Sequence, residues 1–251
     1  MYRVEIQSQG NRFQVVLKGV RRLGGGIRGR IRGFSAASRK RFLDSLTSLE
    51  LGRDVRGLFV TLTYKEVPSP SVCKQHLDRL GKMLVKEFPK GSAYWRFGLE
   101  SEGERAYNPH FHYLFFNVKF LPVLWLEGVW SEVTDGMGGF VFVQEVRGWR
   151  QALAYVSKYM GKPVQERSLD YIAYLTGERW TGRMWGVLNR ANLPVAEAFV
   201  LTYPFGAWFY RVKRCGRRVW KGVNRKRMAG FTLYRDDPVQ WVKLCAVMVS
   251  T

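Results

Sequence analysis

The segment from Gly57 to Met160 constrains the fold most, because it switches repeatedly between strand-like and helix-like patterns. Apolar and β-branched residues that alternate with polar ones predict four strands, at Gly57–Tyr64, Tyr94–Glu100, His110–Lys119 and Phe140–Val146. Apolar residues at helical spacing predict three helices, at Val72–Phe88, Leu121–Val133 and Trp149–Met160. The order β-α-β-β-α-β-α favours an α+β fold, with a central antiparallel sheet flanked by helices.

The charge of the chain indicates its class of partner. It carries 41 Lys and Arg against 20 Asp and Glu, for a net charge of +21 and a pI near 10.3. A charge of this size favours a polyanion such as nucleic acid. Hydrophobic residues make up 46% of the chain and aromatic residues 15%, which excludes a disordered basic tail. No apolar run reaches the roughly 18–20 residues that span a bilayer, so we expect a soluble protein without membrane contact.

Two stretches concentrate the positive charge. Residues 18–41 and residues 211–227 each carry nine Lys or Arg and no acid, and both interleave Arg with Gly, Phe or Trp. Arginine binds phosphate and aromatic rings stack on bases, so this pattern favours contact with DNA, although two solvated loops are the alternative. The predicted DNA-binding residues in these stretches are Arg28, Arg30, Arg32, Arg214, Arg217, Arg218, Lys221, Arg225, Lys226 and Arg227.

Two of the three histidines in the chain stand two residues apart, at His110 and His112. Successive side chains of a strand point to opposite faces, so both imidazoles should lie on one face. Glu100 ends the strand expected to pair with this one, which would bring its carboxylate close to the imidazoles. Such a set of oxygen and nitrogen ligands can hold Mg²⁺ or Mn²⁺ against a phosphate. Glu102 has the same parity and is the competing third ligand, and we expect the third histidine, His76, at the surface.

Two tyrosines on the last predicted helix are candidate nucleophiles. Tyr155 and Tyr159 are four residues apart and therefore share one helix face, with Lys158 at its edge. A phenol has a pKa of about 10 and attacks poorly unless its phenolate is stabilised, which a neighbouring ammonium would do in part. The sequence favours Tyr155 for the first attack, because it begins the Tyr-x-x-Lys unit. The alternative is that both tyrosines simply fill the core-facing side of an amphipathic helix.

Together these segments resemble a known family. Phe59–Tyr64, Pro109–His112 and Tyr155–Lys162 resemble motifs I, II and III of the HUH rolling-circle replication initiators. The form with two tyrosines is similar to the initiators of small single-stranded DNA phages and related plasmids. The segment Gly182–Gly186, which contains Arg183, resembles the R-x-W-G element that follows motif III in such proteins, so Arg183 is a further predicted DNA contact.

The resemblance implies a ferredoxin-like or RRM-like HUH palm and assigns roles within it. His110, His112 and Glu100 would be metal ligands, and Tyr155 and Tyr159 would be nucleophiles supported by Lys158. On this basis we divide the chain into a basic N-terminal extension (residues 1–54), an HUH endonuclease core (55–165) and a basic C-terminal segment for DNA contact (166–251).

The activity implied is metal-dependent, site-specific nicking and strand transfer that initiates rolling-circle replication of a plasmid or phage genome. A 5′-phosphotyrosine would form at a single-stranded replication origin, with the nick site in an open strand or a hairpin. Because no GxxxxGK[ST] motif occurs, a host helicase would unwind the DNA, and a host polymerase would extend the free 3′ end in a prokaryotic cytoplasm. The alternatives are a two-tyrosine HUH transposase of a mobile element and a non-catalytic protein that binds single-stranded DNA or RNA.

Overall fold

The computed structural model describes residues 3–10, 12–18, 31–50, 56–99, 108–204 and 230–234. The chain divides into two compact units. The larger unit consists of Arg28–Phe42 and Leu51–Pro194, and the smaller unit consists of Met1–Ile27, Leu43–Glu50 and Val195–Thr251.

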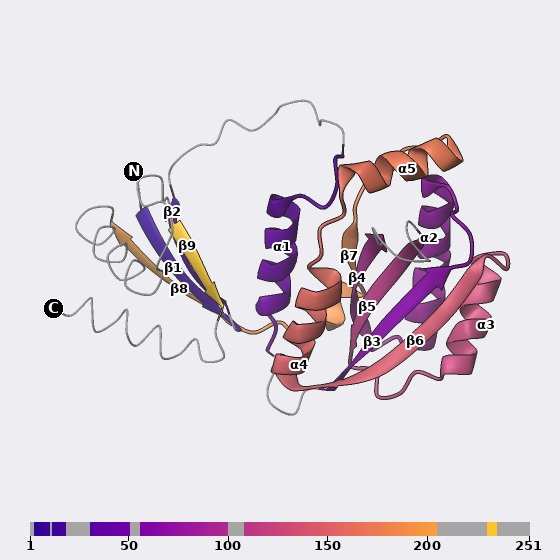
Figure 1. The fold of residues 1–251 in the computed structure, drawn as a ribbon. Helices are drawn as coiled ribbons and strands as arrows, with labels where there is room; N and C mark the ends of the chain where they lie inside the picture. The colour runs from indigo at the N-terminus through magenta and orange to yellow at the C-terminus, as the bar shows by residue number, and fades with distance from the viewer. Residues whose placement is uncertain are drawn as a thin grey trace. The chain divides into compact units, whose positions relative to one another are not determined.

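A five-stranded antiparallel sheet in the order β6-β3-β5-β4-β7 forms the centre of the larger unit (Figure 1). Its strands are β3 (Arg56–Tyr64), β4 (Ser92–Leu99), β5 (Pro109–Phe116), β6 (Gly138–Arg147) and β7 (Trp185–Leu188). The predicted α+β fold with a central antiparallel sheet is confirmed, and the first four strands are those expected from the alternation. The edge strand β7 was not predicted, and it comes from the segment after residue 165.

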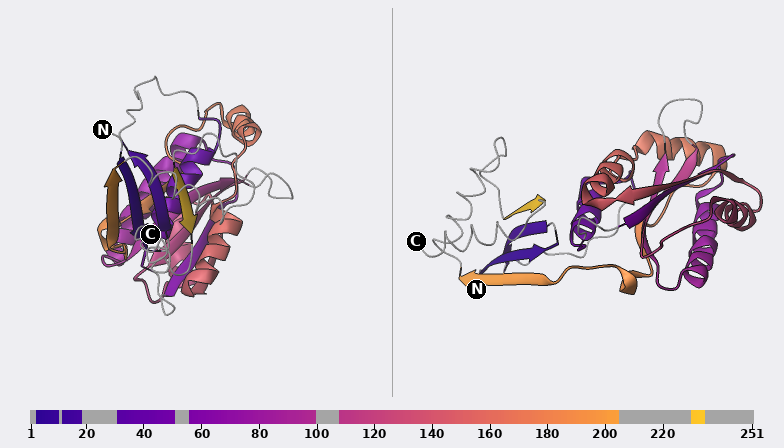
Figure 2. Two further views of the ribbon diagram at one scale, coloured as in Figure 1. Left: turned by 90° about the vertical axis from the view of Figure 1, so that its left-hand side faces the viewer. Right: turned by 90° about the horizontal axis from the view of Figure 1, so that it is seen from below.

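Helices cover both faces of this sheet (Figure 1, Figure 2). On one face lie α2 (Pro70–Glu87) and α3 (Val123–Val133). On the other face α4 (Gly148–Tyr155) packs against β3 and β6 and continues into a short π-helix, η1 (Val156–Met160). The remaining elements are α1 (Ala36–Thr47), α5 (Glu166–Thr176) and a short 3₁₀ turn, η2 (Arg190–Asn192).

Local sequence signals explain why α2 forms where it does. Ser69 is its N-cap and accepts a hydrogen bond from the backbone N–H of Val72, and Pro70 occupies the first turn, where its missing N–H costs nothing. Leu80 and Leu84, four residues apart, are fully buried against the sheet. The predicted helix Val72–Phe88 is therefore confirmed with a start two residues earlier.

The alternation of β3 and β5 divides their side chains between two buried layers. Tyr64 and Phe111 point to the face covered by α2 and α3, where both rings contact Trp130 of α3. The indole Nε1 of Trp130 donates a hydrogen bond of 2.8 Å to the carbonyl of Thr63, which joins α3 to the end of β3. All eight residues of β5 are buried, so this strand runs through the middle of the core.

A second antiparallel sheet, in the order β8-β1-β2-β9, forms the smaller unit. Its strands are β1 (Arg3–Gln9), β2 (Arg12–Lys18), β8 (Ala198–Pro204) and β9 (Gly230–Tyr234), and Ile6 and Val15 are among its buried residues. Gly10 turns the chain between β1 and β2 at φ +55°, and a Cβ there would clash with the backbone carbonyls of Thr47 and Leu49. This sheet was not predicted, because its strands come from the two ends of the chain.

Within the described ranges, no helix combines the length and the apolar character needed to cross a membrane.

Candidate active site

His110 and His112 lie next to each other on β5, on the sheet face that α4 and η1 cover. Their ring centroids are 4.7 Å apart, and both side chains are buried, with 7% and 4% of their surface exposed. The cross-strand partners of the pair are Thr63 and Thr61 on β3, and Gly98 and Arg96 on β4. The spacing of two residues therefore places both imidazoles on one face, as the alternation of the strand requires.

Neighbouring groups hold each imidazole through its Nδ1 atom. His110 Nδ1 lies 3.3 Å from the backbone carbonyl of Asn108, which can only accept a hydrogen bond, so this nitrogen carries the ring proton and the lone pair is on Nε2. His112 Nδ1 is hydrogen-bonded to Thr61 Oγ1 at 3.0 Å. Groups of this kind orient metal-binding histidines and fix their tautomers.

Gly98 makes room for the His110 ring. The two residues are direct partners across β4 and β5, and a Cβ at position 98 would clash with the imidazole, nearest to Nε2. A glycine in the interior of a strand weakens the strand but allows another group to approach its backbone closely. The sequence analysis missed this residue, for which the available signal was a single glycine near the end of an otherwise bulky strand.

The imidazole of His112 is neutral. Burial is the main cause that holds its pKa well below the ordinary value, and His110, Arg96 and Lys162 add to the effect through their positive charge. A neutral imidazole has a lone pair to offer to a cation, and this is the protonation state in which histidine binds metals.

Tyr155 and Tyr159 stack on the same side of the sheet as the histidines. Their ring centroids are 5.8 Å apart at an interplanar angle of 19°. Phe59 of β3 lies beneath both rings, 5.0 Å from Tyr155 and 5.4 Å from Tyr159, and it also stacks on His112 at 5.4 Å. The centroid of the Tyr159 ring is 5.6 Å from that of His112. One phenylalanine therefore holds the tyrosines and the histidine in a single cluster.

The end of the helix that carries these tyrosines departs from the prediction of a regular α-helix over Trp149–Met160. The chain is α-helical as far as Tyr155 and then widens into the π-helix η1, where the N–H of Gly161 donates to the carbonyl of Val156. Single turns of π-helix are uncommon and occur often at functional sites. Both tyrosines still face the sheet, so the expected common face is retained.

Lys158 lies beside Tyr159. Its Nζ atom is 5.0 Å from the centroid of that ring, and the side chain is exposed. The hydrogen bond and charge interaction with the Tyr159 phenol raise the pKa of Lys158, and Tyr155 adds a smaller contribution. The ammonium is therefore positioned to stabilise a phenolate at Tyr159 more than at Tyr155.

Arg96 holds the C-terminal end of η1 against the sheet. It is buried, with 2% of its surface exposed, although it is the only charged residue of β4. Its Nη1 atom donates a hydrogen bond of 2.9 Å to the carbonyl of Tyr159, and its Nη2 atom donates to the carbonyl of Lys162. The guanidinium also lies over the ring of Phe34, 4.9 Å from its centroid. Carbonyls at the end of a helix lack partners within the helix, and a buried cation satisfies them.

We expect Arg96→Met to destabilise the larger unit by about 2–4 kcal/mol, because it leaves two buried carbonyls without their charged donor. Urea unfolding measures the loss. The matched control is Arg79→Met, since Arg79 is half exposed and pairs with the exposed Asp135 at 3.0 Å, and such a surface pair contributes less than about 1 kcal/mol. Equal losses in the two variants would contradict the role given to Arg96.

The other predicted site residues fall into two groups. Arg32 and Arg183 are described and exposed. Glu100 and its competitor Glu102 lie outside the described residues, as do Arg28, Arg30, Arg214, Arg217, Arg218, Lys221, Arg225, Lys226 and Arg227. In the described part of the chain, no group of three or more His, Cys, Asp or Glu side chains is close enough together to hold a metal ion, so the histidine pair would need a ligand from elsewhere.

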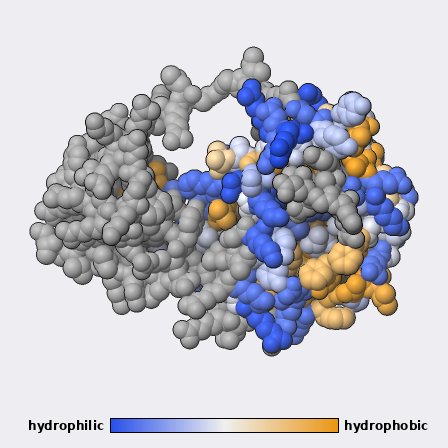
Figure 3. Space-filling view, in the orientation of Figure 1, coloured by the Kyte–Doolittle hydropathy of each residue, from blue (hydrophilic) through white to orange (hydrophobic). Residues whose placement is uncertain are grey.

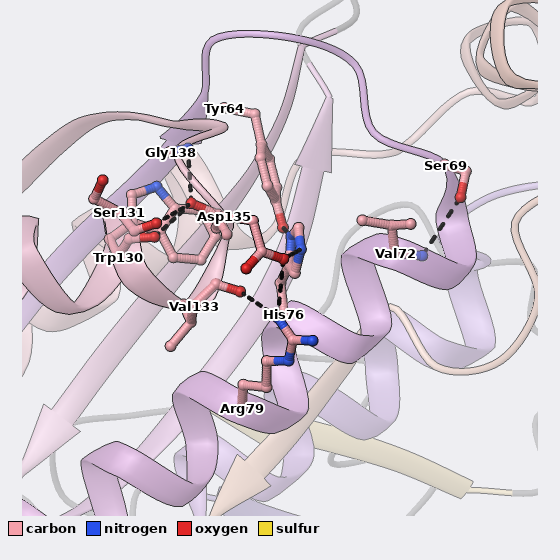
Figure 4. A network of polar contacts seen from close by, with 11 residues as sticks. Tyr64, Ser69, Val72, His76, Arg79, Trp130, Ser131, Val133, Asp135 and Gly138 are labelled. Carbon is pink, nitrogen blue, oxygen red and sulfur yellow. Dashed lines mark hydrogen bonds and ion pairs between the residues drawn. The ribbon is translucent and has the colours of Figure 1, made fainter.

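The expectation that His76 lies at the surface is wrong. It is buried on α2 with 2% of its surface exposed, and its Nδ1 atom is hydrogen-bonded to the hydroxyl of Tyr64 at 3.2 Å (Figure 4). Its Nε2 atom lies 4.0 Å from the carboxylate of Asp135. Burial lowers the pKa of His76, and burial likewise raises that of the Tyr64 phenol. His76 faces the α2 and α3 layer, on the side of the sheet opposite to His110 and His112.

The fold and the site together define the class: an α+β domain whose central strand presents two histidines to a helix with two stacked tyrosines. Residues 57–164 match a protein family model described as a replication-associated protein, ORF2 or phage gene 2 protein. The match begins in β3, ends just beyond η1, and includes both histidines and both tyrosines. This part of the chain is therefore similar to replication-associated proteins. No curated protein and no solved structure matches the chain.

Proposed function

We propose that the protein is a replication initiator that nicks and rejoins single-stranded DNA through a phosphotyrosine intermediate, at the origin of a phage or plasmid genome. The observation that carries the proposal is the cluster on Phe59, which brings His112, Tyr155 and Tyr159 into mutual contact. The family match over the same residues supports a role in replication. A protein that only bound nucleic acid would have no use for neutral imidazoles beside stacked phenols.

Tyr159 is the better placed of the two tyrosines for the first cleavage. Its ring lies 5.6 Å from that of His112, and Lys158 is hydrogen-bonded to its phenol. The sequence pattern favours Tyr155 instead, but the contact with the ammonium favours the phenolate of Tyr159. Tyr155 stacks on Tyr159 and would make the second attack, when the new strand is released and joined.

The chemistry follows from these positions. The oxygen of Tyr159 attacks the scissile phosphorus and loses its proton to water, and the bond from phosphorus to the 3′ oxygen breaks. That oxygen takes up a proton and becomes a free 3′-OH, while the 5′ phosphate stays on the tyrosine. Attack of a 3′-OH on this phosphotyrosine reverses the step and joins two ends, so no nucleotide cofactor is consumed. Host enzymes would unwind the duplex and extend the 3′ end.

His110 and His112 are the residues that would hold a divalent cation, Mg²⁺ or Mn²⁺, with Glu100 as the proposed third ligand. The donor chemistry fits, because one ring is neutral and each ring is held through Nδ1. A cation bound there neutralises phosphate oxygens and makes the phosphorus more electrophilic.

The experiment that tests the proposal is a search for the covalent intermediate. We expect that incubation with labelled single-stranded DNA of the cognate origin and Mn²⁺ yields a protein–DNA adduct that survives a denaturing gel and disappears in EDTA. A labelled strand with the origin sequence scrambled is the control for site specificity. Binding without any adduct or cleaved strand would favour the non-catalytic alternative. Cleavage at the ends of a mobile element rather than at an origin would favour a transposase.

A further inference from the structure

The edge strand β6 exposes two aromatic rings on the same sheet face as the candidate active site. Phe140 and Phe142 are two residues apart, with 55% and 39% of their surface exposed, and their rings stack with centroids 6.3 Å apart at 23°. Apolar side chains at the surface of the larger unit are visible in Figure 3. Exposed phenylalanines on an edge strand contribute little to folding and invite unwanted association, so their presence calls for another role.

Strand pairing connects these rings to the site. Phe142 is the partner of Thr61 across β6 and β3, and Thr61 is in turn the partner of His112 across β3 and β5. The hydroxyl of Thr61 contacts His112, which confirms that this row of side chains lies on one face. Phe142 is thus two strand spacings from His112, about 10 Å. Thr63 contacts the backbone carbonyl of Phe140 and is the partner of His110, so Phe140 extends the same surface.

The charge of this face suits a polyanion. The register places no Asp or Glu on this side of any described strand of the larger sheet, because Glu145 alternates with Phe142 and Gln144 to the opposite face. Lys158, on η1 above this face, is exposed and carries its charge firmly, since its pKa is raised. An acidic or apolar protein partner would not need a surface of this sign next to the nucleophiles.

We propose that Phe140 and Phe142 form a stacking platform for two bases of the single-stranded DNA next to the scissile phosphate. Parallel, solvent-facing rings are what sequence-tolerant binding of bases requires, because every base has a π-face. The platform rests on the proposed function for the identity of its ligand. It would hold the strand on the β6 side while Tyr159 attacks at the histidine side, so that the phosphate is placed by contacts on both flanks.

The test measures binding to two oligomers that differ only in their bases. Fluorescently labelled oligothymidylate and an abasic oligomer of the same length carry the same phosphates, and EDTA prevents cleavage. In the Phe140→Leu/Phe142→Leu variant we expect the affinity for oligothymidylate to fall by about tenfold per ring and the affinity for the abasic oligomer to stay the same. Phe140→Tyr/Phe142→Tyr keeps both rings and should bind as the wild type does, which separates stacking from a loss of folding.

The matched control is Phe120→Leu, which removes an equally simple ring that is 73% exposed in the loop after β5, beyond the end of the strand opposite to His110. Unchanged affinity of the Leu double variant for oligothymidylate would overturn the proposal and favour a protein partner for these rings. Equal losses on both oligomers, or a loss in the Phe120 control as large as in the double variant, would overturn it as well. The absence of a covalent adduct in the wild type would contradict the nicking activity and leave this binding result untouched.

Discussion

Replacing Tyr155 and Tyr159 together by Phe should reduce formation of the covalent adduct and nicking by at least about 1,000-fold, because no nucleophilic oxygen remains. Phenylalanine preserves the rings that stack on each other and on Phe59, so only the hydroxyls are lost. The double variant should therefore unfold at the same temperature as the wild type and bind single-stranded DNA with the same affinity. A gel for the adduct, a thermal melt and a binding titration measure these three quantities.

The single variants separate the roles of the tyrosines. Tyr159→Phe should lose the first adduct, because Tyr159 is the ring next to His112 and Lys158. Tyr155→Phe should still nick an origin oligonucleotide and fail in strand joining. Mass spectrometry of the wild-type adduct identifies the residue directly. An adduct on Tyr155, together with full initial nicking by Tyr159→Phe, would reverse the order. Equal nicking by the two singles would mean that either tyrosine can begin.

Replacing His110 and His112 together by Ala should reduce nicking by about 1,000-fold and leave the affinity for single-stranded DNA unchanged. The imidazoles would serve the cation that polarises the phosphate, whereas affinity comes mainly from Lys and Arg contacts with the backbone. EDTA should reproduce the loss in the wild type, and added Mn²⁺ should restore activity only where the histidines are present. Nicking assays and binding titrations on the same preparations measure both effects.

His76→Ala is the matched control for the histidine variants. It removes the same side chain from the opposite side of the sheet, where it is hydrogen-bonded to Tyr64. We expect it to lower stability by about 1–3 kcal/mol through the unpaired phenol, and to leave the nicking rate of the folded protein intact. Full nicking by the His110/His112 double variant would refute the assignment of the metal site, and loss of nicking in folded His76→Ala would remove its selectivity.

Much of the larger unit could be predicted from local patterns. The strands β3, β4, β5 and β6 and the helices α2, α3 and α4 follow from the period of their apolar residues, since burial of one face acts on each segment separately. The smaller sheet could not be predicted in this way. Its central strand β1 pairs with β2 next to it in the chain and with β8 near the other end, and no local period records a pairing of that range.

The sequence by itself determined which side chains carry the chemistry of the candidate site. The spacing His110-x-His112 on a strand and Tyr155-x-x-x-Tyr159 on a helix puts each pair on one face whatever the rest of the fold is, because strand and helix periods are properties of the backbone. The order of the segments along the chain and their resemblance to the replication initiators followed from the same residues.

Only the tertiary structure decided how those pairs meet and what supports them. Phe59 joins the tyrosines to His112 because β3 lies between β5 and β6, an order that depends on pairing between distant segments. Arg96 is a charged residue that local reasoning would place in solvent, yet it is buried because the carbonyls of Tyr159 and Lys162 need its donors. The exposure of Phe140 and Phe142 likewise follows from the place of β6 at the edge of the sheet, where no further strand or helix covers their rings. Period is local, whereas burial is set by whichever neighbours the whole chain brings to a residue.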